Sequence, residues 1–161
     1  MLANINDLES LTPYEEMGEL DKWILDVAQK TFSDVHKSFS NYNFVQGMNI
    51  LNNFIANELS GMYIDMTKDS LYCNAKNDPR RMASQSAMAI ITKSLLLLMA
   101  PILTYTADEI VDNAPVIIKG DASDIFDLKY EEIKDIKSDF NTEYMVKARE
   151  GFGTIVDALK K

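Results

Sequence analysis

The sequence has very few residues that could bind a metal or form a disulfide. Among its 161 residues are one cysteine, Cys73, and one histidine, His36. A lone cysteine excludes an intramolecular disulfide and favours a reducing compartment, so we expect a cytoplasmic protein. The two residues are also too few for a zinc site of the usual kind, and we expect no metal site. His36 has no evident catalytic partner and is interpreted as a surface or structural residue.

Motifs for catalysis and membrane insertion are missing as well. There is no phosphate-binding loop, and "GFG" at 151–153 lacks both a preceding strand and the third glycine of a dinucleotide loop. The most apolar run, residues 95–103, is far shorter than the roughly 20 residues of a membrane span, and Pro101 interrupts it. The start of the chain does not resemble a signal peptide. We therefore expect no catalytic residue, no cofactor and no membrane contact in this chain.

What the sequence does contain is helical periodicity. Apolar residues recur every three or four positions and predict helices near residues 18–39, 43–69, 79–99 and 142–159. Asp78-Pro79 is a strong start signal for the third helix, and Pro101 ends it. No segment alternates with period two. With short connections between the helices, the sequence predicts an all-α antiparallel bundle.

Two finer predictions concern helix packing and capping. Gly47 and Gly61 lie inside the second predicted helix, where glycine is unfavourable, and this indicates close helix crossings at both positions. Thr106 and Glu109 have the spacing of a capping box, which predicts a short helix beginning at Thr106 and ending before Pro115.

The charge is unevenly distributed along the chain. The whole sequence carries a formal charge of −9, yet residues 60–100 hold five basic and three acidic residues. In an antiparallel pair of helices the basic residues around the "CNAKND" loop meet at one end of the bundle. Adjacent helical residues point about 100° apart. We therefore expect Arg80 to face solvent and Arg81 to turn inward against Asp65 or Asp69.

This cluster of basic residues has two interpretations. It can be an internal ion-pair network with Asp65, Asp69 and Asp78, or a surface that binds anions or nucleic acid. In the second case the cations contact phosphates, and an aromatic ring and two amides are available for bases. The candidate binding residues are Lys68, Lys76, Arg80, Arg81, Tyr72, Asn74 and Asn77. Spacing alone leaves both interpretations open.

A family resemblance covers essentially the whole chain and is specific over residues 52–110. This stretch resembles the anticodon-binding domain of class I aminoacyl-tRNA synthetases, and within that group the bacterial isoleucyl enzymes. Ser70 stands where the family usually has a basic residue. The matching elements are Leu59-Ser60, Tyr63-Ile64-Asp65, Lys68-Asp69, Leu71-Tyr72, Arg80-Arg81, residues 100–103, Thr106 and Asp108-Glu109.

The resemblance implies a bundle that binds the anticodon stem-loop of a tRNA. It implies residues 1–115 as the anticodon-binding bundle, truncated on its N-terminal side, and 116–161 as a linker with a C-terminal helical extension. The parent enzyme would attach isoleucine to tRNA with ATP and magnesium, with zinc in a C-terminal part, and its catalytic and editing domains would contact the bundle. The valyl, leucyl and methionyl members, and a free-standing helical interaction module, are the alternatives.

A piece of a larger enzyme should expose apolar side chains that neighbouring domains cover. We therefore expect self-association of this chain through methionine-rich helix faces. Such methionines adapt readily to new contacts. The residues expected on these faces are Met62, Met66, Met82 and Met88.

Overall fold

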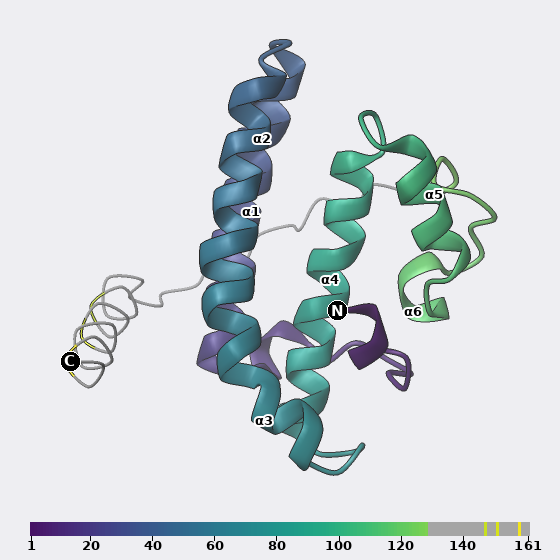
Figure 1. Ribbon diagram of the computed structural model, residues 1–161. Helices are drawn as coiled ribbons and strands as arrows, with labels where there is room; N and C mark the ends of the chain where they lie inside the picture. Colours follow the sequence, from purple (N-terminus) through teal and green to yellow (C-terminus); the bar gives the residue numbers. More distant parts are fainter. Residues whose placement is uncertain (129–146, 148–150, 152–157, 159–161) are drawn as a thin grey trace.

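The computed structural model describes residues 1–128, 147, 151 and 158 (Figure 1). These residues form helices and connections without a strand, so the predicted all-α class is confirmed. The helix predicted over residues 142–159 lies almost wholly outside the described residues. The elements in chain order are η1 (Leu2–Asn4), η2 (Tyr14–Glu16), α1 (Glu19–Ser40), α2 (Phe44–Asn53), η3 (Phe54–Ile64), α3 (Asp65–Cys73), α4 (Pro79–Met99), α5 (Thr104–Asp112) and α6 (Val116–Lys119).

The bundle is built on three long helical runs (Figure 1). Helix α1 packs against the run formed by α2, η3 and α3, and both contact α4. Helices α5 and α6 pack on the other side of α4, and the N-terminal segment crosses its lower half. The α1–α2 connection therefore lies at one end of the bundle and the α3–α4 connection at the other.

Helix α1 buries the face that its periodicity predicts. Trp23, Ile24, Ala28, Phe32 and Val35 are all buried in the common core. Burial of such large apolar side chains stabilises a fold by about 1.5–3 kcal/mol each relative to exposure. The charged residues of the opposite face, such as Lys30 and Lys37, remain exposed.

The second run is continuous from Phe44 to Cys73, but its middle part, η3, is a π-helix of 11 residues. This widened helix explains one wrong prediction. A Cβ on Gly61 would lie 2.8 Å from the Ala56 carbonyl oxygen of its own helix, so the close contact there is internal. At Gly47 the predicted crossing is confirmed, because a Cβ there would lie 2.5 Å from the Phe39 ring of α1.

Helix α4 begins and ends as predicted. Asp78 is its N-cap, Pro79 its first residue, and it ends at Met99, before Pro101. By length and composition it could cross a membrane, but 61% of its most apolar stretch is buried in the bundle. The core helix of a soluble bundle passes the same test.

The capping box predicted at Thr106 is wrong. Helix α5 begins two residues earlier, at Thr104, and its N-cap residue Leu103 makes no side-chain capping bond. The chain turns back after α4, so that α5 runs down beside it (Figure 1), and the Thr104 hydroxyl donates to the Ala100 carbonyl at 2.7 Å. This contact links the C-cap residue of α4 to the first residue of α5. The helix still ends at Asp112, before Pro115, as predicted.

The methionine faces predicted to mediate self-association are largely internal. Met62 and Met88 are buried in the core, and Met82 is half-buried. Only Met66, at 56% exposure, reaches solvent. Periodicity identified apolar positions correctly, but most of them lie in the core of the bundle, so these residues do not form the predicted surface.

Candidate functional site

The connection between α3 and α4, residues 74–78, presents the predicted basic cluster. Its shape depends on Asp78, whose carboxylate accepts the backbone N–H groups of Arg80 at 2.9 Å and Arg81 at 3.3 Å. Those bonds, led by the one from Arg81, hold the pKa of Asp78 below its usual range. Asp78 is thus occupied as a helix cap, and among the residues that the structure describes it forms none of the ion pairs considered for it from sequence.

Arg81 turns inward, as expected, but its partners differ from those predicted. Its side chain is only 17% exposed and pairs with Asp7 at 2.9 Å, not with Asp65 or Asp69. The second terminal nitrogen donates to the Asn74 carbonyl at 3.0 Å. Arg81 therefore ties the α3–α4 connection to the N-terminal segment.

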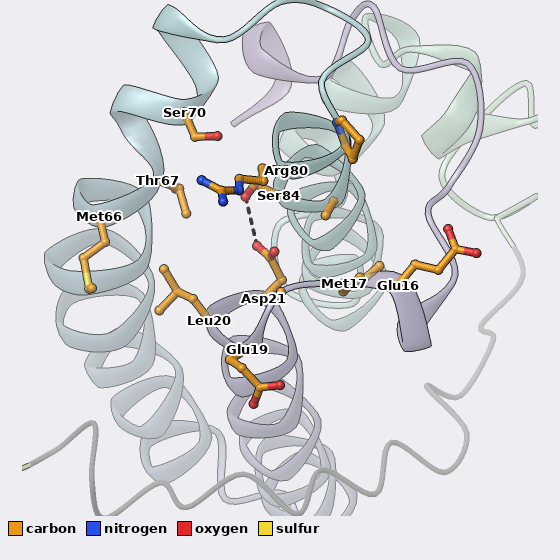
Figure 2. A pocket seen from close by; sticks show the side chains of 13 residues that line it. Glu16, Met17, Glu19, Leu20, Asp21, Met66, Thr67, Ser70, Arg80 and Ser84 are labelled. Carbon is orange, nitrogen blue, oxygen red and sulfur yellow. Dashed lines mark hydrogen bonds between the residues drawn. The ribbon is translucent and has the colours of Figure 1, made fainter.

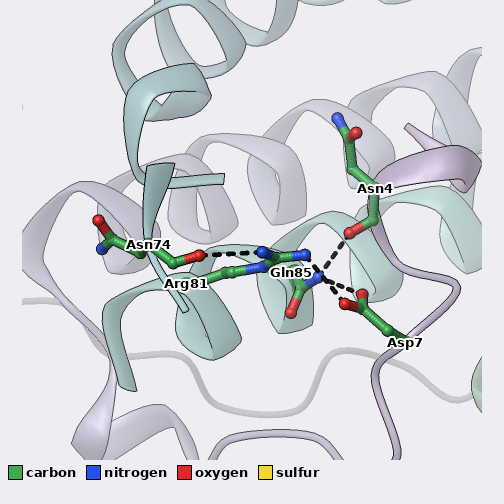
Figure 3. A network of polar contacts seen from close by, with 5 residues as sticks. All are labelled: Asn4, Asp7, Asn74, Arg81 and Gln85. Carbon is green, nitrogen blue, oxygen red and sulfur yellow. Dashed lines mark hydrogen bonds and ion pairs between the residues drawn. The ribbon is translucent and has the colours of Figure 1, made fainter. Parts of the chain in front are cut away.

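Gln85, one turn further along α4, extends this network (Figure 3). Its amide nitrogen donates to the Asn4 carbonyl at 2.6 Å and to the other Asp7 carboxylate oxygen at 2.8 Å. Among the described residues, the Arg81 Nε has no hydrogen-bond partner. These contacts make Arg81 a positioning residue for the connection rather than part of its outer surface.

The other three cations are exposed. Lys68 pairs with Asp65 at 2.7 Å on the surface of α3, so the ion-pair interpretation holds for this one pair. Such exposed pairs contribute about 0.2–1 kcal/mol. Lys76 and Arg80 are exposed and make no ion pair within the described part of the chain.

The three predicted base-reading side chains are placed differently from one another. The Tyr72 ring is 72% exposed on the last turn of α3, where a base could stack on it. Asn77 is exposed in the connection. Asn74 is half-buried, and its amide donates to the Ser70 hydroxyl at 3.1 Å, so it helps to close α3.

A buried polar network lies directly under this end of the bundle. Tyr63 of η3 donates its hydroxyl to Asp21 of α1 at 2.6 Å, and the Ser84 hydroxyl of α4 donates to the same oxygen at 3.0 Å. Burial raises the pKa of Asp21, while these two bonds and one from the Gly18 backbone oppose the rise. Burial, with the Asp21 charge, also raises the pKa of Tyr63 well above its usual range. The network joins three helices at one point.

Arg80 lies over this network in a surface groove of about 370 Å³ (Figure 2). One side of the groove comes from α3, with Met66, Thr67 and Ser70, and the other from the start of α1. Figure 2 shows the guanidinium of Arg80 inside this groove, above Asp21. The described residues include no group of His, Cys, Asp and Glu side chains that could hold a metal ion.

A family model described as the anticodon-binding domain of tRNA ligase matches residues 21–161. The chain belongs to this family. Over its whole length it is 68% identical to an isoleucine–tRNA ligase of Sulfurimonas denitrificans, 56% to one of Nitratiruptor and 51% to one of Sulfurovum. It spans only 17–18% of the length of these relatives. The resemblance found in the sequence is thus confirmed, including its isoleucyl character.

Sequence reasoning found the loop of this anticodon-binding domain but missed what supports it. Tyr63 was noted as a family element without a role, and neither Asp21 nor Asp7 was singled out. A weak signal existed for Asp21, because an acidic residue three positions after the Gly18 N-cap often reaches back to cap its helix. The partners Tyr63 and Ser84 are 42 and 63 residues away, and no local pattern indicates them.

Proposed function

We propose that this domain binds the anticodon stem-loop of a tRNA through the end of the bundle formed by α3, the 74–78 connection and the start of α4. The observation that carries the proposal is the pair of exposed cations, Lys76 and Arg80, on an otherwise acidic member of the anticodon-binding family. Lysine and arginine contacts to phosphates fix the position of a nucleic acid, while exposed rings and amides contact bases.

The electrostatics support a local binding surface. The chain as a whole carries a charge of −9 and would repel nucleic acid non-specifically. At physiological salt, however, charges more than about 8 Å apart are largely screened. A few cations at one end can therefore attract phosphates while the rest of the surface suppresses binding elsewhere.

The similarity to isoleucine–tRNA ligases supports a role within such an enzyme. We propose that the longer protein attaches isoleucine to its tRNA with ATP and magnesium, and that this domain contributes binding without catalysis. Zinc, where the longer enzyme uses it, would be held by other parts of that protein. In this role the domain would contact the catalytic and editing parts of the same polypeptide in the cytoplasm.

The proposal predicts a specific change in the salt dependence of tRNA binding. Lys76→Ala and Arg80→Ala should each reduce the slope of log K against log salt by about 0.7–0.9, the value expected for one lost phosphate contact. The measurement is a binding titration of the isoleucine tRNA with the 161-residue chain at several salt concentrations. Melting temperatures should stay near that of the unsubstituted chain, because both side chains are exposed.

Lys37→Ala is the matched control. Lys37 is also an exposed lysine on a helix, but it lies at the opposite end of α1 and pairs with Asp34. Its removal should leave the slope unchanged. If Lys76→Ala and Arg80→Ala also leave the slope of the unsubstituted chain unchanged, the cations at the α3–α4 end do not contact phosphate. The assigned surface would then be wrong.

A further inference from the structure

We propose that the end of the bundle opposite the tRNA surface docks on another part of the longer ligase polypeptide through an uncharged, apolar face. This inference rests on the part of the proposed function that places the domain in a longer ligase, and it adds the surface that would be covered there. Figure 1 shows the α1–α2 and α4–α5 connections together at this end of the bundle.

Large apolar side chains are exposed at both connections. Eleven such side chains are exposed among the described residues, and six of the eleven lie at this one end. An exposed apolar surface of this kind marks a site that another molecule or domain covers. The surface is named the apolar end and consists of Tyr42, Phe44, Val45, Ile102, Leu103 and Tyr105.

Both connections also lack charge. Residues 38–57 and 94–107 contain no Asp, Glu, Lys or Arg, although 25% of the residues in the chain are charged. The core of a protein interface is depleted of charged residues and enriched in aromatic ones. The apolar end has this composition, whereas the tRNA surface at the other end carries charges of both signs.

The backbone at Tyr42 presents its ring to solvent. Tyr42 follows α1 in the left-handed conformation, with φ at 58°, where helices usually place glycine. The N–H groups of Tyr42 and Asn43 donate to the Phe39 and Ser38 carbonyls at 2.9 and 2.8 Å and close the helix end. A large side chain in this conformation costs backbone free energy. Because the ring is 84% exposed, its burial in the bundle does not offset that cost, and a contact outside the described residues would.

An apolar groove of about 520 Å³ continues this surface. It lies between η3, α4 and α5, and Leu103 belongs both to the groove and to the apolar end. No charged side chain lines it, and Ile55, Leu95, Met99 and Ile110 in its walls are only half-buried. The apolar face of a helix from the docked part would complete the burial of these four side chains.

The charges favour a part of the same polypeptide over other occupants. RNA is disfavoured because phosphate binding requires cations, and residues 38–57 and 94–107 supply none. A second copy would bring its own charge of −9 and would lose translational and rotational freedom on association. A covalently linked domain avoids most of that loss. The chain spans 17–18% of its relatives, so most of such a polypeptide lies outside it.

Three tyrosines make the proposal measurable. Tyr42 and Tyr105 lie at the apolar end and Tyr72 at the tRNA end, with exposed fractions of 84%, 92% and 72%. The rate of nitration of each ring is followed by peptide mass spectrometry in the 161-residue chain and in the longer ligase. In the ligase Tyr42 and Tyr105 should react about 10-fold more slowly or less, because an undocked state populated at about 10% or below exposes them only for that fraction of time. Without tRNA, Tyr72 should react at similar rates in both proteins.

A matched pair of valine variants tests the surface itself. Val45 at the apolar end and Val116 on α6 are 75% and 73% exposed, so a charge at either position should leave the 161-residue chain folded. In the ligase, Val45→Glu should raise the nitration rate of Tyr42 towards that in the 161-residue chain, because docking would bury an unpaired carboxylate. Val116→Glu should leave Tyr42 protected. Full protection of Tyr42 in both variants would overturn the proposed surface.

The remaining outcomes separate this inference from the proposed function. If Tyr42 and Tyr105 react at the same rates in both proteins, the apolar end is not docked and the inference is wrong. It is also wrong if their protection requires tRNA, or if it appears in the 161-residue chain as the protein concentration rises, because RNA or a second copy is then the occupant. Tyr72 tests the tRNA surface independently: tRNA should slow its nitration, and an unchanged rate would count against that surface whatever happens at the apolar end.

Discussion

The two ends of the long helical run from Phe44 to Cys73 are held in different ways. At the α1–α2 end, the contacts are local and aromatic: the Phe39 and Phe44 rings lie 5.5 Å apart, and Tyr42 packs edge-on against Phe44. At the α3–α4 end, the connection is held by polar contacts to a segment 74 residues away, between Arg81 and Asp7. Both connections are short, yet only the second depends on the rest of the fold.

This difference matters for binding. The α1–α2 end exposes Tyr42 and Val45, and Lys37, near the end of α1, is paired with Asp34. The α3–α4 end exposes Lys76 and Arg80 without ion pairs within the described residues, while Arg81 fixes the loop that carries Lys76. The two neighbouring arginines thus have different roles. Arg81 supports the connection, and Arg80 faces the groove.

The largest expected effect on stability comes from removing Arg81, the arginine that supports the α3–α4 connection. Arg81→Ala should lower the free energy of unfolding by about 2–3 kcal/mol, because it leaves the half-buried Asp7 carboxylate without its cation and frees the Asn74 carbonyl. Arg80→Ala, at the neighbouring position, should change it by less than about 0.5 kcal/mol. Urea unfolding of both variants measures the difference. Similar losses would show that the two arginines share one structural role.

A smaller effect is expected at the opposite end. Gly47→Ala should destabilise the chain by about 1 kcal/mol, since the new methyl group would press on the Phe39 ring at 2.5 Å. Part of that loss is offset by the better helix propensity of alanine. Gly61→Ala provides a comparison inside η3. There the added Cβ would lie 2.8 Å from the backbone carbonyl oxygen of Ala56 instead of against a side chain. If Gly47→Ala were neutral, α1 and α2 would not be as closely packed as described.

The smallest expected effect on stability concerns the N-cap residues of α4 and α2, Asp78 and Asn43. It depends on pH. Asp78 accepts two backbone N–H groups, whereas Asn43, the cap of α2, accepts one, from Gln46 at 3.3 Å. The pKa of Asp78 is lowered from 3.8. Its charged form therefore adds stability above pH 3.8, and this contribution is lost as the pH falls through the lower folded pKa.

Asp78→Asn should thus be less stable than the unsubstituted chain at pH 7, and the gap should shrink as the pH falls below 3.8. Thermal melts of both proteins across this range provide the measurement. Asn43→Asp tests the reverse change at the other end, where a charge should help at neutral pH. A gap for Asp78→Asn that does not vary with pH would exclude the carboxylate charge as the source of its capping strength.

Local signals in the sequence determined the helices and their ends. Apolar periodicity, the Asp78-Pro79 start and the Pro101 stop act within a few residues, so the boundaries of α1 and α4 were predicted closely. The π-helical form of η3 was not, because it differs from an α-helix in hydrogen-bond spacing, i→i+5 instead of i→i+4, and no residue type in this stretch signals that change. The start of α5 was misplaced because this helix begins without the side-chain cap that the sequence suggested: its N-cap residue is Leu103, which makes no capping bond.

The family, the basic cluster and the exposure of Arg80 could also be anticipated from residues 52–110. What only the tertiary structure decided is which charges are occupied and where a cavity remains. Asp7 pairs with Arg81, and Asp21 meets Tyr63 and Ser84, through contacts between residues 42 to 74 positions apart. Such pairs form when packing of the apolar faces sets the positions of the helices. The spacing of side chains along the chain therefore does not predict them. The groove under Arg80 has the same origin, as the space left where α1, α3 and α4 meet.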